Sequence, residues 1–432
     1  MYQYNRILKN MLLIMIIIGL FSIVIGYYQN LSIDENYIHN LFQTSPERFY
    51  LQPSYHDIKT IDNEYIHHLL EKAHNRPWAA LYMAAFYFTG ISLGALFFLG
   101  IQYIAQARWV IIVNNVIEGI TSFIPYGGIL IFLILILNVG GFLHMFHWMD
   151  PSLSYNGSHY DPIIFNKSIF LNIPFYLFRV FLYITGWTFF MWWMKLLSNK
   201  LYLTNSLNEY KRLYTVSVVF ISFFSITSMM MVWDWVMSLN THWLSTLFGW
   251  YVLVTNLVCG ITVIVIFALY LKSKGFLPIF NDHHLHDLAK YIFSTSLLWT
   301  YLWFSQFLLY WYGNIPEEVS YFMQRANQYG YIHFIMIIPN FIFPLLGFIS
   351  RRAKKKPKIV IIIGFIILIG HIIDIYNMIM PACVGNFYGF GASEIGSLLF
   401  VGSVFILIVF REISLFKLFP KGNPFFNESA IV

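Results

Sequence analysis

The chain has 432 residues, of which 58% are hydrophobic and only 11% are charged, and its mean hydropathy is +0.64. A soluble globule of this length needs more polar surface than this composition supplies, so we predict a membrane protein. The formal charge of +6 comes from Lys and Arg residues that lie between apolar runs. This distribution makes them determinants of membrane topology and argues against a nucleic-acid-binding surface.

Runs of about 20 apolar residues, the length that crosses a bilayer as a helix, occur ten times in the sequence. Spanning segments must satisfy their own backbone hydrogen bonds, and the alternating strands of a membrane barrel are absent from the sequence. We therefore predict an all-α integral membrane protein with an uncleaved first helix. The ten spans lie near Met11–Tyr27, Trp78–Ile104, Ile124–His147, Leu171–Met194, Leu213–Met237, Trp243–Leu271, Leu288–Tyr312, Tyr329–Ile349, Lys358–Met380 and Ser393–Phe410.

The basic residues predict the orientation of these spans. If the N-terminus is cytoplasmic, the inside loops hold 19 of the 26 Lys and Arg residues, including the run at Arg351–Lys358. Positive charge concentrates in cytoplasmic loops, so we expect both termini in the cytoplasm and a bacterial-type inner membrane as the location. The segment from Tyr28 to Pro77 then lies in the periplasm, where it could dock a partner.

The cysteines limit the cofactors. Cys259 and Cys383 are the only two, and there is no CxxC or CxxCH motif, which excludes covalent haem c and thiolate-bound iron–sulfur clusters in this chain. No span carries the pair of widely spaced histidines that a di-haem helix needs. We predict that the chain binds no redox cofactor, so that any redox reaction depends on electron carriers in partner subunits.

Charged side chains are costly inside a bilayer, which makes each of them a functional hypothesis. Arg179 lies about 12 Å into the fourth span at 1.5 Å per residue. Asp374 lies near the outer end of the ninth span, with His371 one turn before it on the same face. A buried His–Asp pair can exchange protons near neutral pH. The alternative for Arg179 and Asp374 is a structural ion pair that holds two helices together.

Further polar residues gather at predicted outer ends of helices. His144 and His147 occupy the last turn of the third span, and Asp234 and His242 flank the turn between spans five and six. Anchoring at the membrane surface and helix capping are equally good interpretations of these residues. The inner half of the membrane offers mostly hydroxyls and amides. This asymmetry predicts an acid–base site that opens to the outside, as the oxidation of a quinol requires when it releases two protons.

Six runs together resemble the NrfD-like, polysulfide-reductase-type membrane subunits, and within that family the second such subunit of alternative complex III, a bacterial quinol:cytochrome c oxidoreductase. The resemblance covers nearly the whole chain from Arg76 onward. It is carried by the segments Arg76–Trp109, His144–Asp150, Asp161–Arg179, Met231–Val252, Asn281–Val319 and Gly370–Pro381.

The resemblance implies two four-helix bundles with flanking helices and no cofactor in this subunit. The expected domains are a first transmembrane helix (1–27), a periplasmic segment (28–77), a first bundle (78–237), a second bundle (243–380) and a last helix with a cytoplasmic tail (393–432). The implied partners are a sister NrfD-like subunit, a periplasmic iron–sulfur protein with its clusters, and multihaem cytochrome c subunits.

The resemblance also implies roles for individual residues. His147, Asp161 and Asp234 match elements that form the quinone pocket in the broader family. Arg179, His371 and Asp374 match membrane-embedded polar positions proposed to carry protons.

We therefore expect an integral subunit of a quinol:cytochrome c oxidoreductase that contributes quinone binding, either menaquinone or ubiquinone, and proton transfer. A structural scaffold within the same complex is one alternative. A proton-coupled secondary transporter is another, although transporters usually show paired broken helices in two halves. Here Pro339 and Pro344 break the eighth span, and the earlier half has no counterpart.

Overall fold

The computed structural model describes residues 5–44, 63–150, 153, 160–415 and 425–426 of the chain. Within these residues the protein is all-helical and has no strands, and nine helices are long and apolar enough to cross a membrane. The predicted all-α, multi-pass membrane protein is therefore confirmed at this level. These apolar segments form helices because a helix satisfies the hydrogen bonds of its own backbone groups.

Several of the nine spans are built from consecutive elements. They are α1 (Arg6–Leu31), α4 (Arg76–Ile104), α5 (Asn114–Thr121) with α6 (Ile124–Val139), α8 (Ile173–Thr204), α9 (Leu207–Trp235) with η5 (Met237–Leu239), α10 (Leu247–Ser273), α13 (Gly330–Ile335) with η6 (Ile338–Ile342) and α14 (Phe343–Phe348), α16 (Pro357–Cys383) and α17 (Ala392–Leu415).

One further predicted span, Leu288–Tyr312, forms the long helix α11 (Asp282–Gly313), which packs along α10 but is not among the nine apolar helices. Its many Trp, Tyr, Ser and Thr residues, together with Gln306, make it less apolar than the others. Shorter elements connect the spans: α2 (Glu35–Thr44), α3 (Asn63–His74), η2 (Arg108–Ile112), η3 (His147–Met149), α7 (Pro162–Asn166), α12 (Pro316–Gln328) and α15 (Arg351–Lys354).

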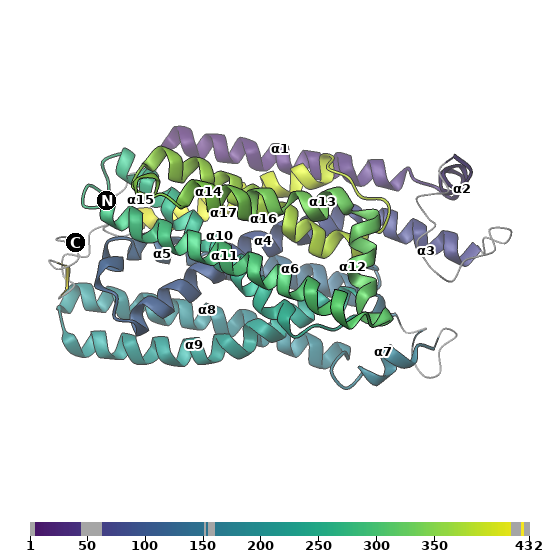
Figure 1. Ribbon diagram of the computed structural model, residues 1–432, viewed down its shortest axis with the longest axis horizontal. Helices are drawn as coiled ribbons and strands as arrows, with labels where there is room; N and C mark the ends of the chain where they lie inside the picture. The colour runs from purple at the N-terminus through teal and green to yellow at the C-terminus, as the bar shows by residue number, and fades with distance from the viewer. Residues whose placement is uncertain (1–4, 45–62, 151–152, 154–159, 416–424, 427–432) are drawn as a thin grey trace.

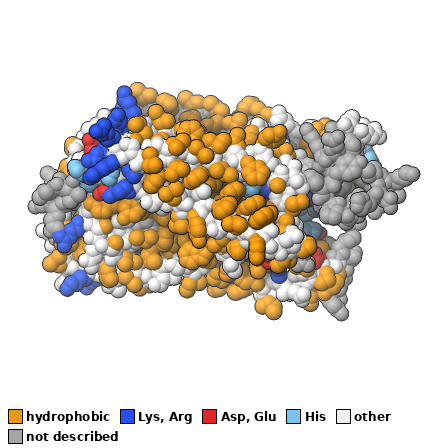
Figure 2. Space-filling view, viewed as in Figure 1, with side chains coloured by type: hydrophobic (Ala, Val, Ile, Leu, Met, Phe, Trp, Pro, Cys, Tyr) orange, Lys and Arg blue, Asp and Glu red, His pale blue; other side chains and the backbone are white. Residues whose placement is uncertain are grey.

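The long helices run side by side along the long axis of the molecule, with α2, α3, α7 and α12 at one end and α15 at the other (Figure 1). Lys and Arg side chains gather at the α15 end, and hydrophobic side chains cover the flank between the two ends (Figure 2). An apolar belt with a basic end is the surface that a bilayer and its positive-inside loops require.

Helices α4 and α10 form the centre of the molecule. The most apolar stretch of each is 83% and 89% buried, whereas that of α1 is only 17% buried. Two glycines allow the two backbones to touch: a Cβ at Gly94 would lie 1.9 Å from the carbonyl oxygen of Asn256, and one at Gly260 would lie 2.6 Å from the nitrogen of Ala95. Small residues at such crossings let membrane helices approach closely.

Two predicted spans include residues that lie in loops. The third span ends at Val139 and the chain turns at Gly141, whose φ of +74° suits glycine, so His144 and His147 lie outside the helix rather than in its last turn. The sixth span begins at Leu247 rather than Trp243, because residues 240–246 form the turn that follows α9 and η5. Both errors arose because apolar loop residues continue the hydrophobic run.

Candidate functional site

Arg179 of α8 and Asp234 of α9 form a buried ion pair. The Nη2 and Nε atoms of Arg179 donate to the two carboxylate oxygens of Asp234 at 2.6 and 2.9 Å, and the hydroxyl of Tyr183 donates to one of them at 2.8 Å. Both charged side chains are at most 2% exposed. Arg179 Nη1 donates to the carbonyl of Phe170 at 2.9 Å, and its guanidinium lies 3.9 Å from the centre of that ring. The two-point geometry compensates the cost of burying both charges.

Asp374 of α16 lies in a second cluster and accepts hydrogen bonds from two other helices, α10 and α11. Its oxygens accept from the Tyr251 hydroxyl, from the Thr255 hydroxyl at 3.3 Å and from the Trp299 indole at 3.0 Å. His371 Nδ1 lies 3.5 Å from the same carboxylate, and both residues are fully buried. An ionised carboxylate has about four acceptor positions, so these four groups match its capacity.

The structure does not bring together Arg179, His371 and Asp374, the three positions expected to carry protons. Arg179 pairs with Asp234, which we had expected in the pocket group, and Asp374 pairs with His371 in another part of the molecule. The reason is the packing of the helices: α8 packs against α9 and α6, whereas α16 packs against α10 and α4. Helical spacing identified the pair on one helix but could not show which helices are neighbours.

Asp161 and His242 meet at the end of the molecule that holds α7. Asp161 Oδ2 lies 2.6 Å from His242 Nε2, and Asp161 Oδ1 caps α7 by accepting from the backbone N–H groups of Ile163 and Ile164. Partial burial raises the pKa of Asp161, but the hydrogen bonds from His242 and from the backbone outweigh it and hold the pKa below its usual value.

His147, the third residue of the expected pocket group, lies in the turn η3 beside α3. Its ring centre is 5.9 Å from that of His68. Burial, followed by the positive charge of Lys72, lowers the pKa of His147, and the same kind of environment lowers the pKa of His68 to about 4. Both imidazoles are therefore neutral at physiological pH.

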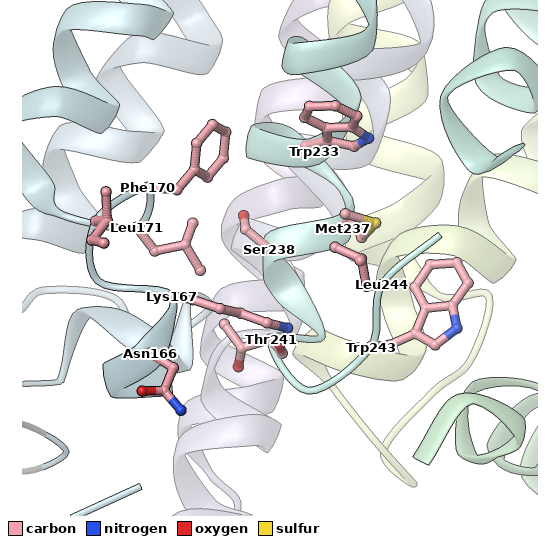
Figure 3. A pocket seen from close by; sticks show the side chains of 11 residues that line it. Asn166, Lys167, Phe170, Leu171, Trp233, Met237, Ser238, Thr241, Trp243 and Leu244 are labelled. Carbon is pink, nitrogen blue, oxygen red and sulfur yellow. Dashed lines mark hydrogen bonds between the residues drawn. The ribbon is translucent and has the colours of Figure 1, made fainter. Parts of the chain in front are cut away.

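A cavity of about 360 Å³ opens between the segment that joins α7 to α8 and the end of α9 with its following turn (Figure 3). Its walls are mostly apolar, and Lys167 lies across one side, where its Nζ donates to the Thr241 carbonyl. The lining residues are Asn166, Lys167, Ile169, Phe170, Leu171, Trp233, Met237, Ser238, Thr241, Trp243 and Leu244.

The cavity lies next to both charged pairs of this region. His242 lies in the chain between two lining residues, Thr241 and Trp243, so the Asp161–His242 pair lies near the cavity although neither residue lines it. Phe170 lines the cavity and also covers the guanidinium of Arg179, so the Arg179–Asp234 pair lies behind the wall. His147 does not line the cavity.

The sequence interpretation missed three buried charged residues. Arg325 of α12 is fully buried and donates to the carbonyls of Asn377, Met378 and Tyr321 at 3.0 to 3.1 Å. Pro381, which has no N–H, leaves the Asn377 carbonyl without its helical partner, and this internal proline was the only available signal.

Glu118 and Glu394 are the other two. Glu118 of α5 is 5% exposed and accepts from Asn114 at 2.8 Å, toward the end of the molecule that carries the basic residues. Glu394 of α17 is fully buried and accepts from Arg76 at 2.7 Å. Glu118 thus adds a carboxylate to the half of the membrane in which the sequence indicates mostly hydroxyls and amides.

Substitution of Asp161 tests the cap and the ion pair separately. Asp161→Asn should keep the α7 cap but lose the charge-assisted bond to His242, whereas Asp161→Ala should lose both and destabilise α7 by a further ~1 kcal/mol. Hydrogen exchange of the Ile163 and Ile164 amides measures this. Because the pKa of Asp161 is lowered in the folded state, ionised Asp161 stabilises the fold. This contribution to stability is present above the ordinary pKa of Asp and is lost as the pH falls through the lowered pKa. Equal exchange in both variants would contradict this assignment.

Comparison with protein-family models gives no match for this chain, and comparison with curated protein sequences gives none either.

Proposed function

We propose that this chain is an integral membrane subunit of a redox complex that oxidises a quinol. More particularly, we propose a quinol:cytochrome c oxidoreductase of the alternative complex III type, in a bacterial inner membrane with both termini cytoplasmic. The observation that carries the proposal is the apolar cavity of about 360 Å³ beside the Asp161–His242 pair. Cofactor pockets of this size are typically apolar with a few placed polar groups.

The surrounding residues suit a quinol head group. When bound, a quinol supplies two electrons and two protons, and the electrons pass to an acceptor in a partner subunit, since this chain is proposed to hold none. In this proposal the nearby Asp161–His242 pair accepts a proton, and Lys167 can donate to a quinone oxygen if it leaves the Thr241 carbonyl. Phe170, Trp233 and Trp243 supply flat apolar surfaces for the ring.

The partners follow from the same proposal. A periplasmic iron–sulfur protein and multihaem cytochrome c subunits carry the electrons, and a sister NrfD-like subunit lies beside this chain. The two halves of the chain, residues 78–237 and 243–380, form two four-helix bundles in this assembly. His371 and Asp374 contribute proton transfer in the second half.

A scaffold role in the same complex is the second candidate. It is favoured by the Arg179–Asp234 pair, which joins α8 to α9 by two hydrogen bonds between buried side chains. A scaffold predicts that changes at the cavity leave turnover unchanged as long as the complex assembles.

Filling the cavity distinguishes the two candidates. Leu171→Trp should weaken binding of a quinone-analogue inhibitor by at least about tenfold, equivalent to 1.4 kcal/mol, because the larger ring occupies the cavity. The measurement is inhibitor titration of quinol-dependent cytochrome c reduction by the complex purified in mild detergent. Leu203→Trp, near the far end of α8, the helix that follows Leu171, is the matched control because Leu203 is 87% exposed. Unchanged inhibition in an intact complex would favour the scaffold, and a chain that purifies without c-type haem would exclude the complex.

A further inference from the structure

A set of five buried polar atoms in the second half of the protein has no hydrogen-bond partner within the part of the chain that the structure describes. They lie on the broken helix, on α16 and on α11, and each belongs to a side chain that is at most 4% exposed. The atoms are Oδ1 and Nδ2 of Asn340, Nε2 of His371, Oδ1 of Asn377 and Oγ of Ser296.

Three of these residues surround the Asp374 cluster. His371, Asp374 and Asn377 follow one another at intervals of three on α16, which places them along one side of the helix. Ser296 lies one turn before Trp299, whose indole donates to Asp374 and whose ring centre is 5.5 Å from that of His371. The Nδ2 of Asn377 lies 3.0 Å from the Nδ1 of His333, another buried histidine.

Asn340 lies in the irregular segment η6, where the span is wound as a π-helix around Pro339. Its side chain is placed against α16, because a Cβ at Gly370 would lie 2.1 Å from Asn340 Oδ1. Pro339 and Pro344 lack N–H groups, so they cannot pair with the carbonyls of the preceding turn. Such π segments frequently mark functional sites. The segment therefore places the two unpartnered atoms of Asn340 against α16 at Gly370, the residue before His371.

Buried polar groups without partners are costly, and in native proteins they are usually satisfied by internal water. A bound cation is a poorer candidate, because Asp374 is the only carboxylate in this group and its acceptor positions already face Tyr251, Thr255, Trp299 and His371. The two amide side chains, the hydroxyl and the imidazole each match a neutral ligand that both donates and accepts.

We infer that internal water molecules bind around η6 and α16, bridging Asn340, His371, Asn377 and Ser296 and giving the buried Asp374 a route for proton exchange. The role of this water in proton exchange rests on the proposed function, whereas the binding of water at the site does not depend on it. Water that joins His371 to Asn377 also extends the cluster toward His333, so that a proton can move by exchange of hydrogen bonds without movement of a helix.

Asn340→Leu tests the inference, since leucine has a similar size but no hydrogen-bonding atoms. In the purified complex, kept at a pH low enough to protonate Asp374, the carboxyl stretch of Asp374 is followed by infrared spectroscopy after transfer to D2O and is assigned by its loss in Asp374→Asn. We expect deuterium exchange at this carboxyl to slow by at least about tenfold, the change that 1.4 kcal/mol produces. If Asn340 is instead dry and unpaired, leucine should raise the thermal stability and leave exchange unchanged, and that result would overturn the inference.

Two further variants complete the test. Asn340→Ser keeps a hydroxyl and leaves more room for water, so it should retain fast exchange even if the leucine variant folds poorly. Ile342→Leu, in the same segment and 40% exposed, should leave exchange unchanged. Exchange that depends on Asn340 in a complex that does not oxidise quinol would refute the proposed function but keep the hydrated site, so the two failures are distinguishable.

Discussion

Arg179→Met should destabilise the protein by about 3–5 kcal/mol, because it leaves the buried carboxylate of Asp234 without its charged partner. Tyr183 alone would remain as a side-chain donor to that carboxylate, and the Phe170 carbonyl would lose its donor as well. The expected result is a large fall in the unfolding temperature and a loss of folded protein from the membrane. Thermal unfolding of the chain purified in detergent measures it.

The double variant Arg179→Met with Asp234→Leu separates the charge from the packing. Removing both partners leaves no buried charge, so much of the lost stability should return. Arg212→Met is the matched control, because Arg212 also forms an ion pair, with Glu209 on α9, but is 68% exposed. Its loss should lower the stability by less than about 1 kcal/mol. A double variant as unstable as the single one would show that packing, and not charge compensation, is what Arg179 supplies.

The sequence predicted the helices of this fold better than the contacts between them. Length and apolarity located the spans, since a helix is the only open structure that satisfies its backbone in lipid. They could not show that α6 ends at Val139, because the apolar residues around Gly141 and Leu143 continue the run although the chain has already turned. The segment 28–77, which we predict to be periplasmic, contains α2 and α3. Its residues 45–62 lie outside the described part of the chain.

The same limit applies to the candidate site. Spacing on one helix correctly brought His371 next to Asp374, because the i and i+3 positions share a face. It could not join Arg179 to Asp234, which lie 55 positions apart on different helices. Lys167 and the cavity could not be foreseen either, since the cavity forms where the segment before α8 meets the turn after α9. Contacts between helices depend on packing, which a single sequence does not encode in any local pattern.

Asp374→Asn should lower quinol-dependent cytochrome c reduction by about 10²-fold or more, the range found when a group that transfers protons is removed. The amide cannot take up or release a proton. It also presents an N–H group to partners that are themselves donors, so at least one of Tyr251, Thr255, Trp299 and His371 loses its acceptor. Turnover per c-type haem of the purified complex is the measurement, because it separates loss of activity from loss of assembly.

Tyr251→Phe distinguishes proton transfer from support of the helices. This variant removes one donor to Asp374 but keeps the carboxylate, with the Trp299 indole still bound at 3.0 Å. If Asp374 carries protons, Tyr251→Phe should retain most of the turnover that Asp374→Asn loses. If Asp374 only holds α10, α11 and α16 together, both variants should lower the thermal stability and neither should change the turnover of the complex that remains assembled. Full turnover in Asp374→Asn would thus assign this carboxylate to the scaffold, because a residue that cannot ionise would then be sufficient at its position.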